Sequence, residues 1–477
     1  MERFDTFYCD GRWVPVAGDD TLAAFDPCTE RQFASVAVCD AAAVDLAVAA
    51  ARRAFDGWSA TPVAGRCAAL RRVHDAMARN AEAFAADLAT EIGAPLWVSR
   101  QMQVPMPLRN LELAIEAIDS MSLETRVAHS LVVREPVGVV AAITPWNFPL
   151  HQIVAKVGAA LAAGCTVVLK PSELAPLAAR RFASIVHEAG LPPGVFNLVW
   201  GDGPRTGAAL AAHPDIDMVS FTGSVAGGRA VAHAAADTVK KVALELGGKS
   251  ATILLDDAPL ADVVQTVLRQ CFTNSGQICA AQTRLLVPRA RLAETEAWCA
   301  THADGWTVGD PAHPGTRLGP VANQRQFEAV QRHIETALAE GARLVAGGPG
   351  RPDGFTRGYF VRPTVFSDVT QPMTLAREEV FGPVLAVMGY DDEDEAVAIA
   401  NGTPYGLSGG VWSADGTRAL TVARRLRAGQ VVINGAPQNL AAPFGGYRQS
   451  GIGRENGRYG VEEFFELKAI QGGCTHD

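Results

Sequence analysis

Apolar residues near the start of the chain recur at spacings of three and four, which is the period of a helix with one buried face. Residues 43–51 show this spacing, and a second helical stretch runs from about 66 to 92. We expect these helices to form an outer layer of the protein.

From residue 138 the pattern changes to short β-branched runs that alternate with longer helical stretches. The expected strands cover residues 139–144, 166–170, 195–199 and 218–222, and the expected helices cover residues 150–163, 176–189 and 204–212. This alternation predicts a parallel sheet with helices on both faces. Ligands bind beyond the carboxyl ends of the strands in such sheets, so we expect four loops to meet at one edge. These loops are residues 144–147, 170–173, 201–207 and 221–224.

A second alternating region runs from 250 to about 434, begins after Gly247 and Gly248, and predicts a second α/β domain. Its expected strands include residues 251–255, 284–287 and 384–388. Residues 118–136 alternate imperfectly and predict a protruding hairpin rather than a core strand. This hairpin either pairs with another copy of the chain or packs on its own chain, and the sequence leaves both open.

Composition and charge narrow the class of partner. A chain of 477 residues is long enough for two or three domains and a buried site. The net charge is −9 and no Lys/Arg-rich block occurs, so neither a nucleic acid nor an anionic membrane is an expected partner. No apolar run reaches the roughly 20 residues of a membrane-spanning helix, and the first residues lack a signal-peptide pattern. A small-molecule substrate fits this composition.

The nine cysteines form no CxxC pair and show no His/Cys spacing typical of zinc, so no metal site is expected. Their scatter favours a reducing compartment, and we expect a cytoplasmic protein. Lysine occurs only at positions 156, 170, 240, 241, 249 and 468, while arginine supplies every other cation. These lysines either act as compact or titratable donors, which arginine cannot do, or reflect codon usage.

Cys279 ends a polar, glycine-containing turn at residues 274–279, and Glu245 ends an apolar run. Taken singly, a cysteine is usually a small core residue and a glutamate a solvated one. Together they predict a nucleophile and a base. No basic residue lies nearer to the thiol in sequence than Arg284, so the fold must activate the thiol. The scattered histidines suggest no catalytic triad, which disfavours a cysteine protease.

Two further polar segments carry candidate chemistry. Asn147 stands in Pro-Trp-Asn-Phe-Pro, residues 145–149, where its amide could donate to an oxyanion or lock the loop. Lys-Pro-Ser-Glu at residues 170–173 directly follows an expected strand. Glu173 could accept from ribose hydroxyls and repel the extra phosphate of NADP, or it could join the serine in capping a helix.

Three glycine-containing segments resemble phosphate loops. Residues 221–228 follow an expected strand and open a helix, so their N–H groups could face a pyrophosphate, although an ordinary strand-to-helix turn fits as well. Residues 201–207 are equally ambiguous. Residues 451–457 follow no clear strand, and we interpret them as a chance match.

These segments occur together and in the order found in the NAD(P)-dependent aldehyde dehydrogenase superfamily, which the chain resembles over nearly its whole length. The other matching segments are residues 221–224, 244–249, 276–279, 378–383, 401–407, 443–447 and 450–455. The resemblance implies an α/β fold with a Rossmann-type parallel-sheet cofactor domain, a second α/β catalytic domain and a small oligomerisation hairpin. The implied borders are residues 1–117 and 137–247 for the NAD-binding domain, 248–445 for the catalytic domain, and 118–136 and 446–477 for the oligomerisation and bridging segments.

By resemblance, Cys279 attacks the aldehyde carbon while the Asn147 amide and the Cys279 backbone N–H hold the oxyanion. Hydride then passes to NAD, and Glu245 activates the water that hydrolyses the thioester to a carboxylate, which suits a buried carboxyl group with a raised pKa. Lys156 and Glu455 match positions that some members use as a proton exit route.

The resemblance also implies a site for NAD, with NADP possible but less favoured. The matching positions are Ile143, Thr144, Trp146, Lys170, Ser172, Glu173, Gly203, Gly207, Phe221, Gly223, Ser224, Leu246, Glu379 and Phe381. Glu379 would bind the nicotinamide ribose, and Lys170 would bind the adenosine ribose. The hairpin and the carboxyl tail would form dimer contacts, giving a homodimer or a homotetramer.

The substrate region departs from the best-known members, so the resemblance implies no particular aldehyde. The residues expected to line the access tunnel are Trp146, Phe148, His151, Gln152, Ala155, Ile278 and Phe444. The small Ala155 leaves room for a bulky or aromatic aldehyde. A CoA-acylating relative is disfavoured because Glu245 supplies a base for water. The alternatives to an aldehyde-oxidising enzyme are a non-redox thiol esterase and a catalytically silent structural homologue.

Overall fold

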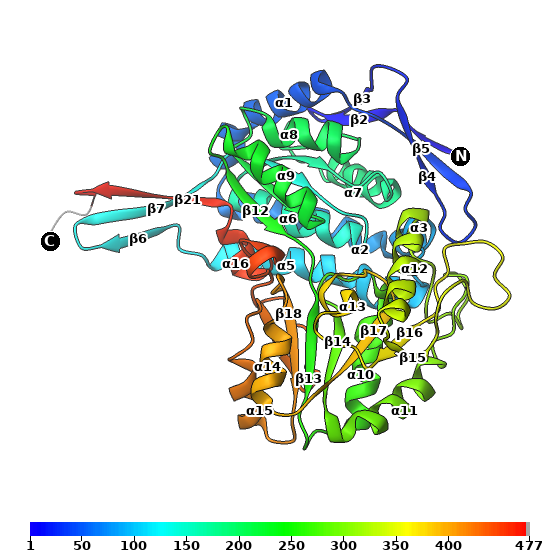
Figure 1. Ribbon diagram of the computed structural model, residues 1–477. Coiled ribbons are helices and arrows are strands. Elements are labelled where there is room, and N and C mark those ends of the chain that lie inside the picture. The colour runs from blue at the N-terminus through cyan, green and yellow to red at the C-terminus, as the bar shows by residue number, and fades with distance from the viewer. Residues whose placement is uncertain (474–477) are drawn as a thin grey trace.

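The computed structural model describes residues 1–473, which form two layered α/β bodies and a protruding arm (Figure 1). The first body is built on an eight-stranded sheet with the order β20-β12-β11-β8-β9-β10-β2-β3. Its strands are β2 (Thr6–Cys9), β3 (Arg12–Pro15), β8 (Val139–Ile143), β9 (Thr166–Lys170), β10 (Phe196–Leu198), β11 (Met218–Thr222), β12 (Lys241–Glu245) and β20 (Gly451–Ile452). The strands from β12 to β10 pair in parallel, whereas β20, β2 and β3 add antiparallel edges.

The parallel sheet expected from the sequence is confirmed, because β8, β9, β10 and β11 lie within the four predicted runs and share this sheet. All residues of β8 and β9 are buried, as is typical of strands covered by helices on both faces. Residues 451 and 452 form β20, which pairs with Leu244 and Glu245 at the end of β12, and the interpretation of residues 451–457 as a chance match to a phosphate loop stays a prediction. A two-residue strand carries no periodic signal, so its pairing depends on tertiary contacts alone.

Helices cover both faces of this sheet, and their bounds follow the apolar pattern closely. They are α1 (Ala41–Ser59), α2 (Val63–Arg79), α3 (Ala81–Ile92), α4 (Leu96–Val98), α5 (Pro105–Ser120), α6 (Pro149–Ala163), α7 (Pro176–Glu188), α8 (Ala208–Ala212), α9 (Val225–Ala236) and α16 (Gly457–Glu462). Every residue of α6 is buried, because this helix lies between the sheet and α2 and α5.

α1 packs directly on the sheet, where the Thr166 hydroxyl donates to the Ala51 carbonyl at 2.9 Å, and its opposite face is exposed, in agreement with the expected outer layer. Two other expectations about these helices were wrong in detail. The stretch from 66 to 92 is two helices, because Asn80 ends α2 and its side-chain amide donates to the Ala76 carbonyl. Residues 204–212 begin as the π-helical turn η2 (Gly203–Gly207), and only five residues continue as α8.

The second body confirms the second α/β fold that the alternating pattern after residue 250 predicts. Its seven-stranded sheet has the order β15-β16-β17-β14-β13-β18-β19, in which only the edge strand β15 is antiparallel to its neighbour. The strands are β13 (Ser250–Leu254), β14 (Gln282–Pro288), β15 (Arg343–Ala346), β16 (Thr364–Ser367), β17 (Val384–Tyr390), β18 (Ser408–Trp412) and β19 (Gln430–Ile433). The helices are α10 (Leu260–Phe272), α11 (Leu292–Ala303), α12 (Gln324–Ala339), α13 (Thr374–Arg377), α14 (Glu393–Asn401) and α15 (Gly416–Ala423).

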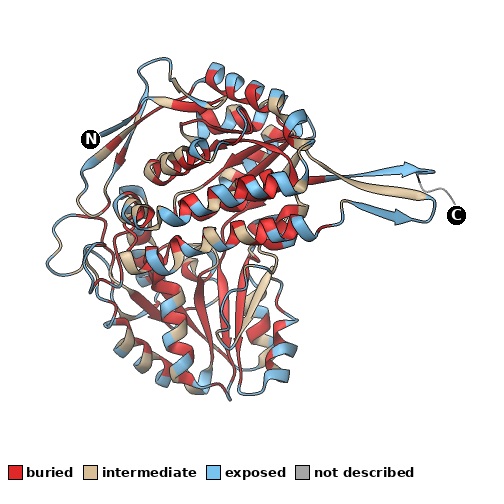
Figure 2. Ribbon diagram, turned by 180° about the vertical axis from the view of Figure 1, so that it is seen from behind, coloured by how far each residue is buried: buried red, intermediate tan, exposed pale blue. Residues whose placement is uncertain are grey.

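The arm consists of three antiparallel strands, β6 (Glu124–Val127), β7 (Ser130–Pro136) and β21 (Phe465–Gln471), with β7 in the middle. The expected protruding hairpin is therefore present, and it pairs with a strand from the end of its own chain. Figure 2 shows that the arm is exposed or half-buried beyond the buried Phe465 at the start of β21, in contrast to the buried strands of the two bodies.

Near the amino terminus, a separate three-stranded sheet contains β1 (Glu2–Phe4), β5 (Gln32–Ala37) and β4 (Thr21–Phe25). Within residues 1–473, no helix combines the length and the apolar content that crossing a membrane requires.

Candidate active site

The candidate site lies at the carboxyl ends of the parallel strands of the first body. Thr144 follows β8, Lys170 ends β9, and Glu245 ends β12. The second body contributes Cys279, which follows the turn η3 (Thr273–Gly276). Residues from both bodies therefore meet here.

The turn before Cys279 has an unusual backbone. Asn274 and Ser275 have φ angles of 54° and 57°, in the left-handed region. Gly276 follows with φ 73°, and a Cβ atom there would lie 2.1 Å from the Gly382 carbonyl carbon. Only glycine fits this close approach, and backbone strain of this kind clusters at functional sites. The turn thus fixes the direction in which the thiol points.

Hydrogen bonds tie Asn147 to this turn. Its side-chain amide donates to the Gln277 carbonyl at 3.0 Å, while its own carbonyl accepts from the Asn274 side chain at 3.0 Å. Gln103 donates both to the Asn147 carbonyl and to the Asn274 side chain. The beginning of α6 and the nucleophile turn are therefore one buried, hydrogen-bonded unit.

Cys279 is partly exposed, and its surroundings do not favour a thiolate. Burial raises the pKa of the thiol to about 12, with further contributions from the carboxylates of Glu379 and Glu245. The Ala280 backbone N–H opposes these effects only in part, so the thiol is protonated at neutral pH until a base removes its proton.

Glu245 is 4% exposed, and neither of its carboxylate oxygens has a hydrogen-bond partner among the described residues. Burial raises the pKa of this carboxyl group well above its ordinary value, and the nearby Glu455 raises it further. Lys156 opposes that shift, and the Lys156 ammonium forms a buried ion pair with Glu455. The Glu455 backbone pairs with Phe444, which fixes the pair beside the base.

The expected cofactor positions fall into two groups, and the first lies around the end of β9. The Lys170 ammonium donates to the Gly201 carbonyl at 2.7 Å and lies 3.7 Å from the Glu173 carboxylate. Burial lowers the pKa of Lys170. Ser172 is buried beside them, and Gly203 and Gly207 bound the π-helical turn η2.

The second group follows β8, β11 and β12. Ser224 caps α9, its hydroxyl accepting from the Gly227 N–H at 3.1 Å. A Cβ atom at Gly223 would lie 2.5 Å from the Phe221 ring, so packing alone explains this glycine. The other members of the group are Ile143, Thr144, Trp146, Leu246, Glu379 and Phe381. The rings of Trp146 and Phe381 meet edge to face, with centroids 5.5 Å apart.

The expected substrate residues lie mainly on α6. His151, Gln152 and Ala155 are buried, as is Phe148 immediately before the helix. Burial lowers the pKa of His151 to about 4, so this imidazole is neutral. His151 Nδ1 and Gln152 Oε1 have no hydrogen-bond partner in the described part of the chain. Ile278 is half-buried beside the thiol.

Phe444 lines a hollow whose lining includes no residue of α6 and does not include Cys279. The other lining residues come from β19, the loop 436–443 and Asn456. The loop that departs from the best-known relatives therefore borders this hollow.

Sequence reasoning missed three positions that hold the site together. Gln277 accepts from the Ala322 N–H at 2.8 Å, and Gln103 bridges Asn147 and Asn274. Ser450 donates to the Gly247 carbonyl at 2.6 Å and accepts from the Gly406 N–H. Gln277 and Ser450 lie in the matching segments, which is a usable signal, whereas nothing in the sequence marks Gln103.

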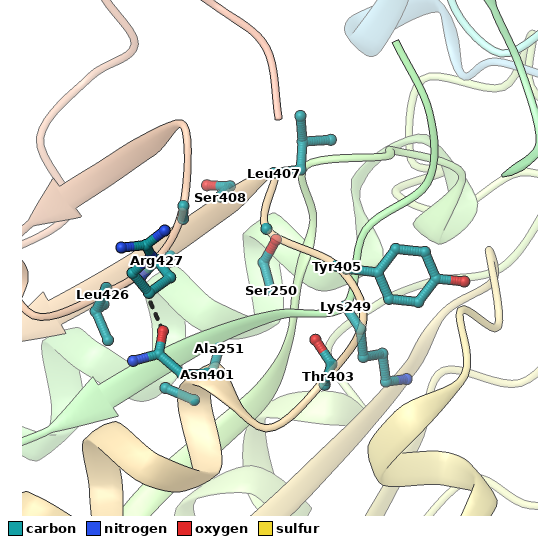
Figure 3. Close-up of a pocket in the computed structure, with 14 residues that line it drawn as sticks. Lys249, Ser250, Ala251, Asn401, Thr403, Tyr405, Leu407, Ser408, Leu426 and Arg427 are labelled. Carbon is teal, nitrogen blue, oxygen red and sulfur yellow. Dashed lines mark hydrogen bonds between the residues drawn. The ribbon is translucent and has the colours of Figure 1, made fainter. Parts of the chain in front are cut away.

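A small hollow lies where β13 and β18 begin (Figure 3). Lys249, Ser250, Thr403 and Tyr405 are among the residues that line it. The Lys249 ammonium and the Ser250 hydroxyl are buried without a hydrogen-bond partner in the described structure. No role was assigned to either side chain from the sequence.

Comparison with known proteins gives a consistent result. The sequence model of the aldehyde dehydrogenase family matches residues 13–470. A 3-succinoylsemialdehyde-pyridine dehydrogenase from a Pseudomonas species is 50% identical over 99% of both chains. A putative aldehyde dehydrogenase from Staphylococcus aureus is 43% identical, again over 99% of both chains.

Comparison with solved structures also identifies aldehyde dehydrogenases as similar proteins. One is a cysteine-to-alanine mutant of an aldehyde dehydrogenase from Pseudomonas syringae, in complex with NAD+ and octanal. It superimposes with a TM-score of 0.98 at 51% identity, covering 99% of this chain and 98% of that one. A Mycobacterium tuberculosis aldehyde dehydrogenase in complex with NAD+ gives 0.96 at 41% identity, covering 100% of both chains. The chain belongs to the aldehyde dehydrogenase family.

Proposed function

We propose that this protein oxidises an aldehyde to a carboxylic acid with NAD. The observation that carries the proposal is the meeting of Cys279, Asn147 and Glu245, from three separate segments, beside the carboxyl ends of the parallel strands. The complexes of the two solved relatives, with NAD+ in both and octanal in one, support the same chemistry.

In the first half of the reaction, the Cys279 thiol gives its proton to Glu245 and its sulfur adds to the aldehyde carbon, so that the carbonyl oxygen becomes an oxyanion. The Asn147 amide and the Cys279 backbone N–H stabilise that charge as preorganised donors. NAD, when bound, accepts the hydride that leaves the same carbon, and a thioester remains on Cys279.

In the second half, Glu245 removes a proton from water while the water oxygen attacks the thioester carbon. The carbon–sulfur bond then breaks, the carboxylic acid and the Cys279 thiolate are released, and a proton from solvent restores the thiol. A buried carboxyl group with a raised pKa suits this task, because its proton affinity lies closer to neutral pH. We propose that the ion pair of Lys156 and Glu455 carries the proton away from Glu245.

The residues present fit a dinucleotide. The Thr144 and Thr222 hydroxyls are buried without a partner in the described chain, and the Glu379 carboxylate is held against the Gly248 backbone. We propose the fourteen cofactor positions predicted above as its site; all of them lie in the body formed by residues 1–117 and 137–247 except Glu379 and Phe381, which the second body contributes. Glu173 supports NAD over NADP, because its carboxylate would repel a 2′-phosphate.

We propose that Phe148, His151, Gln152, Ala155, Ile278 and Phe444 line the aldehyde tunnel. The relatives act on or bind different compounds, namely a pyridine semialdehyde by name and octanal in a complex. Ala155 leaves space for a bulky group in this chain. A panel of aliphatic and aromatic aldehydes is therefore the appropriate substrate test.

We further propose a homodimer or a homotetramer in the cytoplasm. The arm leaves the outer edge of β21 without a strand partner in the described chain, and the edge strand β19 is likewise available for pairing. The eight cysteines within the described residues are all free, which supports a reducing compartment.

The proposed reaction is tested by following NADH absorbance with NAD and the aldehyde panel. We expect NADH with the wild-type protein and none with Cys279→Ala. Ester hydrolysis without any NADH would favour the thiol esterase, and loss of both reactions would favour a silent homologue.

A further inference from the structure

Gln103 is a fully buried glutamine that ends the π-helical turn η1 (Ser99–Gln103), between α4 and α5. The Val104 N–H donates to the Ser99 carbonyl at 3.0 Å, five residues back, as in a π-turn. Turns of this kind inside helical segments occur frequently at functional sites. Figure 1 shows α5, which begins directly after this turn, at the level where the two bodies meet.

The side-chain amide of Gln103 contacts both bodies. Its Nε2 donates to the Asn147 carbonyl at 3.0 Å in the first body and to the Asn274 Oδ1 at 3.2 Å in the second. A backbone carbonyl can only accept, so the nitrogen end of the Gln103 amide must face Asn147. We call these two hydrogen bonds the Gln103 bridge. The bridge joins the segment of the proposed oxyanion donor to the turn that leads to Cys279.

The bridge also fixes the orientation of the Asn274 side chain. Because the Asn274 Oδ1 accepts from Gln103, its Nδ2 faces the Asn147 carbonyl at 3.0 Å and the Gln277 carbonyl at 3.4 Å. The two ends of an amide have nearly the same shape, so hydrogen bonds decide which end faces a carbonyl. Gln103 therefore turns a donor, rather than an acceptor, toward both carbonyls.

The nucleophile turn has further anchors that do not involve the bridge. The Ser275 hydroxyl donates to the Gly319 carbonyl at 2.8 Å, and the Gln277 side chain accepts from the Ala322 N–H at 2.8 Å. Both contacts lie within the second body, so they hold the turn in place by themselves. Asn147 belongs to the first body and depends on the contacts across the boundary for its position against the turn.

Packing alone does not account for a glutamine at position 103. The Gln103 Oε1 is buried without a hydrogen-bond partner among residues 1–473. Burying an unpaired carbonyl group is unfavourable, and a methionine of similar length would fill the same space without that penalty. The two donated bonds are thus the interactions that favour glutamine here.

We propose that Gln103 is a positioning residue that sets the Asn147 amide in register with the Cys279 turn, and thereby raises the rate at which the thiol adds to the aldehyde. The inference rests on the proposed function, in which the Asn147 amide stabilises the oxyanion. A preorganised donor acts only where the charge develops, and a displacement of about 1 Å can lower a rate by roughly a hundredfold.

The test measures NADH formation in the first turnover, with NAD and the fastest aldehyde of the panel, because the oxyanion forms in that step. For Gln103→Met we expect a loss of roughly ten- to a hundredfold, smaller than that of Asn147→Ala, since the donor is displaced rather than removed. Alkylation of Cys279 by iodoacetamide forms no oxyanion. Its rate and the NAD dissociation constant should therefore stay within about twofold of the wild-type values.

A double variant decides whether Gln103 acts through Asn147. In the Asn147→Ala background, Gln103→Met should lower the rate by no more than about twofold further, because no amide is left to position. Asn274→Gly removes the other end of the bridge at a φ of 54°, which glycine adopts readily, and should slow the first turnover as Gln103→Met does.

Gln282→Met is the matched control. Gln282 is buried like Gln103, and its Nε2 donates to the Gly409 carbonyl at 3.2 Å within the second body. This control should form NADH at the wild-type rate.

A wild-type rate for Gln103→Met would overturn the inference, as would equal losses in the wild-type and Asn147→Ala backgrounds. A fall in the alkylation rate as large as the fall in NADH formation would also overturn it, because the turn itself would then have moved. NADH formation by the wild type and its loss in Cys279→Ala test the proposed reaction separately, so the two failures are distinguishable.

Discussion

The Asn147 side-chain amide donates a 3.0 Å hydrogen bond to the carbonyl of Gln277, two residues before Cys279. This contact crosses from the start of α6 in the first body to the nucleophile turn of the second. A buried amide held in this way cannot swing into solvent, and its second N–H is left for another acceptor. The bond therefore holds the proposed oxyanion donor against the turn that leads to Cys279 before any substrate arrives.

Replacing Asn147 with alanine should lower kcat by roughly 10²–10³-fold, the typical loss when one oxyanion donor is removed. The lost bond to Gln277 should also lower the free energy of unfolding by about 1 kcal/mol. Steady-state NADH formation and thermal unfolding measure the two effects. The NAD dissociation constant is the control and should stay unchanged. A kcat close to the wild-type value would remove Asn147 from the proposed chemistry.

The thiol environment predicts slow alkylation of Cys279 in the protein without cofactor. With a pKa of about 12, the thiolate fraction and the rate of reaction with iodoacetamide should rise about tenfold per pH unit between pH 7 and pH 9. Glu245→Gln removes one carboxylate that raises this pKa, so it should react faster at each pH. Peptide mass spectrometry follows the site. Equal rates in both proteins would show that Glu245 does not act on the thiol.

Lys156 and Glu455 should shift the pH profile of deacylation in opposite directions. Lys156 opposes the rise in the pKa of Glu245, so Lys156→Met should move the acid limb of kcat to higher pH. Glu455→Gln removes a carboxylate that raises this pKa and should move the limb to lower pH. Each variant leaves a formerly paired group buried, so thermal unfolding must be measured alongside. Shifts in the same direction would contradict this electrostatic account.

The sequence predicted the parallel strands because an apolar run of five or six residues that is bounded by turns has few alternatives to forming a buried strand. It also brought Cys279, Asn147 and Glu245 into consideration through short polar motifs. The antiparallel edge β20 and the break between α2 and α3 at Asn80 could not be predicted, since both depend on tertiary contacts or on a single cap.

The same limit applies to the candidate site. Gln103 sits in a helical region without any local signal, and its function in holding Asn147 to Asn274 exists only once both bodies are assembled. The sequence likewise does not indicate that the Lys249 ammonium lacks a hydrogen-bond partner in the described structure. The scarcity of lysine drew attention to that position without indicating what surrounds it.

Glu173→Gln should weaken the preference for NAD. The Glu173 carboxylate lies 3.7 Å from the Lys170 ammonium and is partly exposed at the end of β9. Glutamine keeps the size of the side chain but removes the charge that would repel a 2′-phosphate. We expect the ratio of kcat/KM for NAD over NADP to fall by at least about tenfold, which corresponds to roughly 1.4 kcal/mol of repulsion. An unchanged ratio would leave the cofactor preference to other residues.

We expect the arm to hold the subunits of the proposed oligomer together. In β21, Leu467 and Ile470 are 67% and 42% exposed, and apolar side chains this open on an edge strand are typical of a surface covered by a partner. The double variant Leu467→Glu and Ile470→Glu should therefore lower the molar mass in solution, measured by light scattering, to that of one chain. Leu46→Glu provides the matched control, because Leu46 is 58% exposed on α1 of the first body, outside the arm. The control should keep the wild-type mass, and NAD should still bind to the dissociated chain. If the double variant keeps the wild-type mass, β21 does not hold the subunits together.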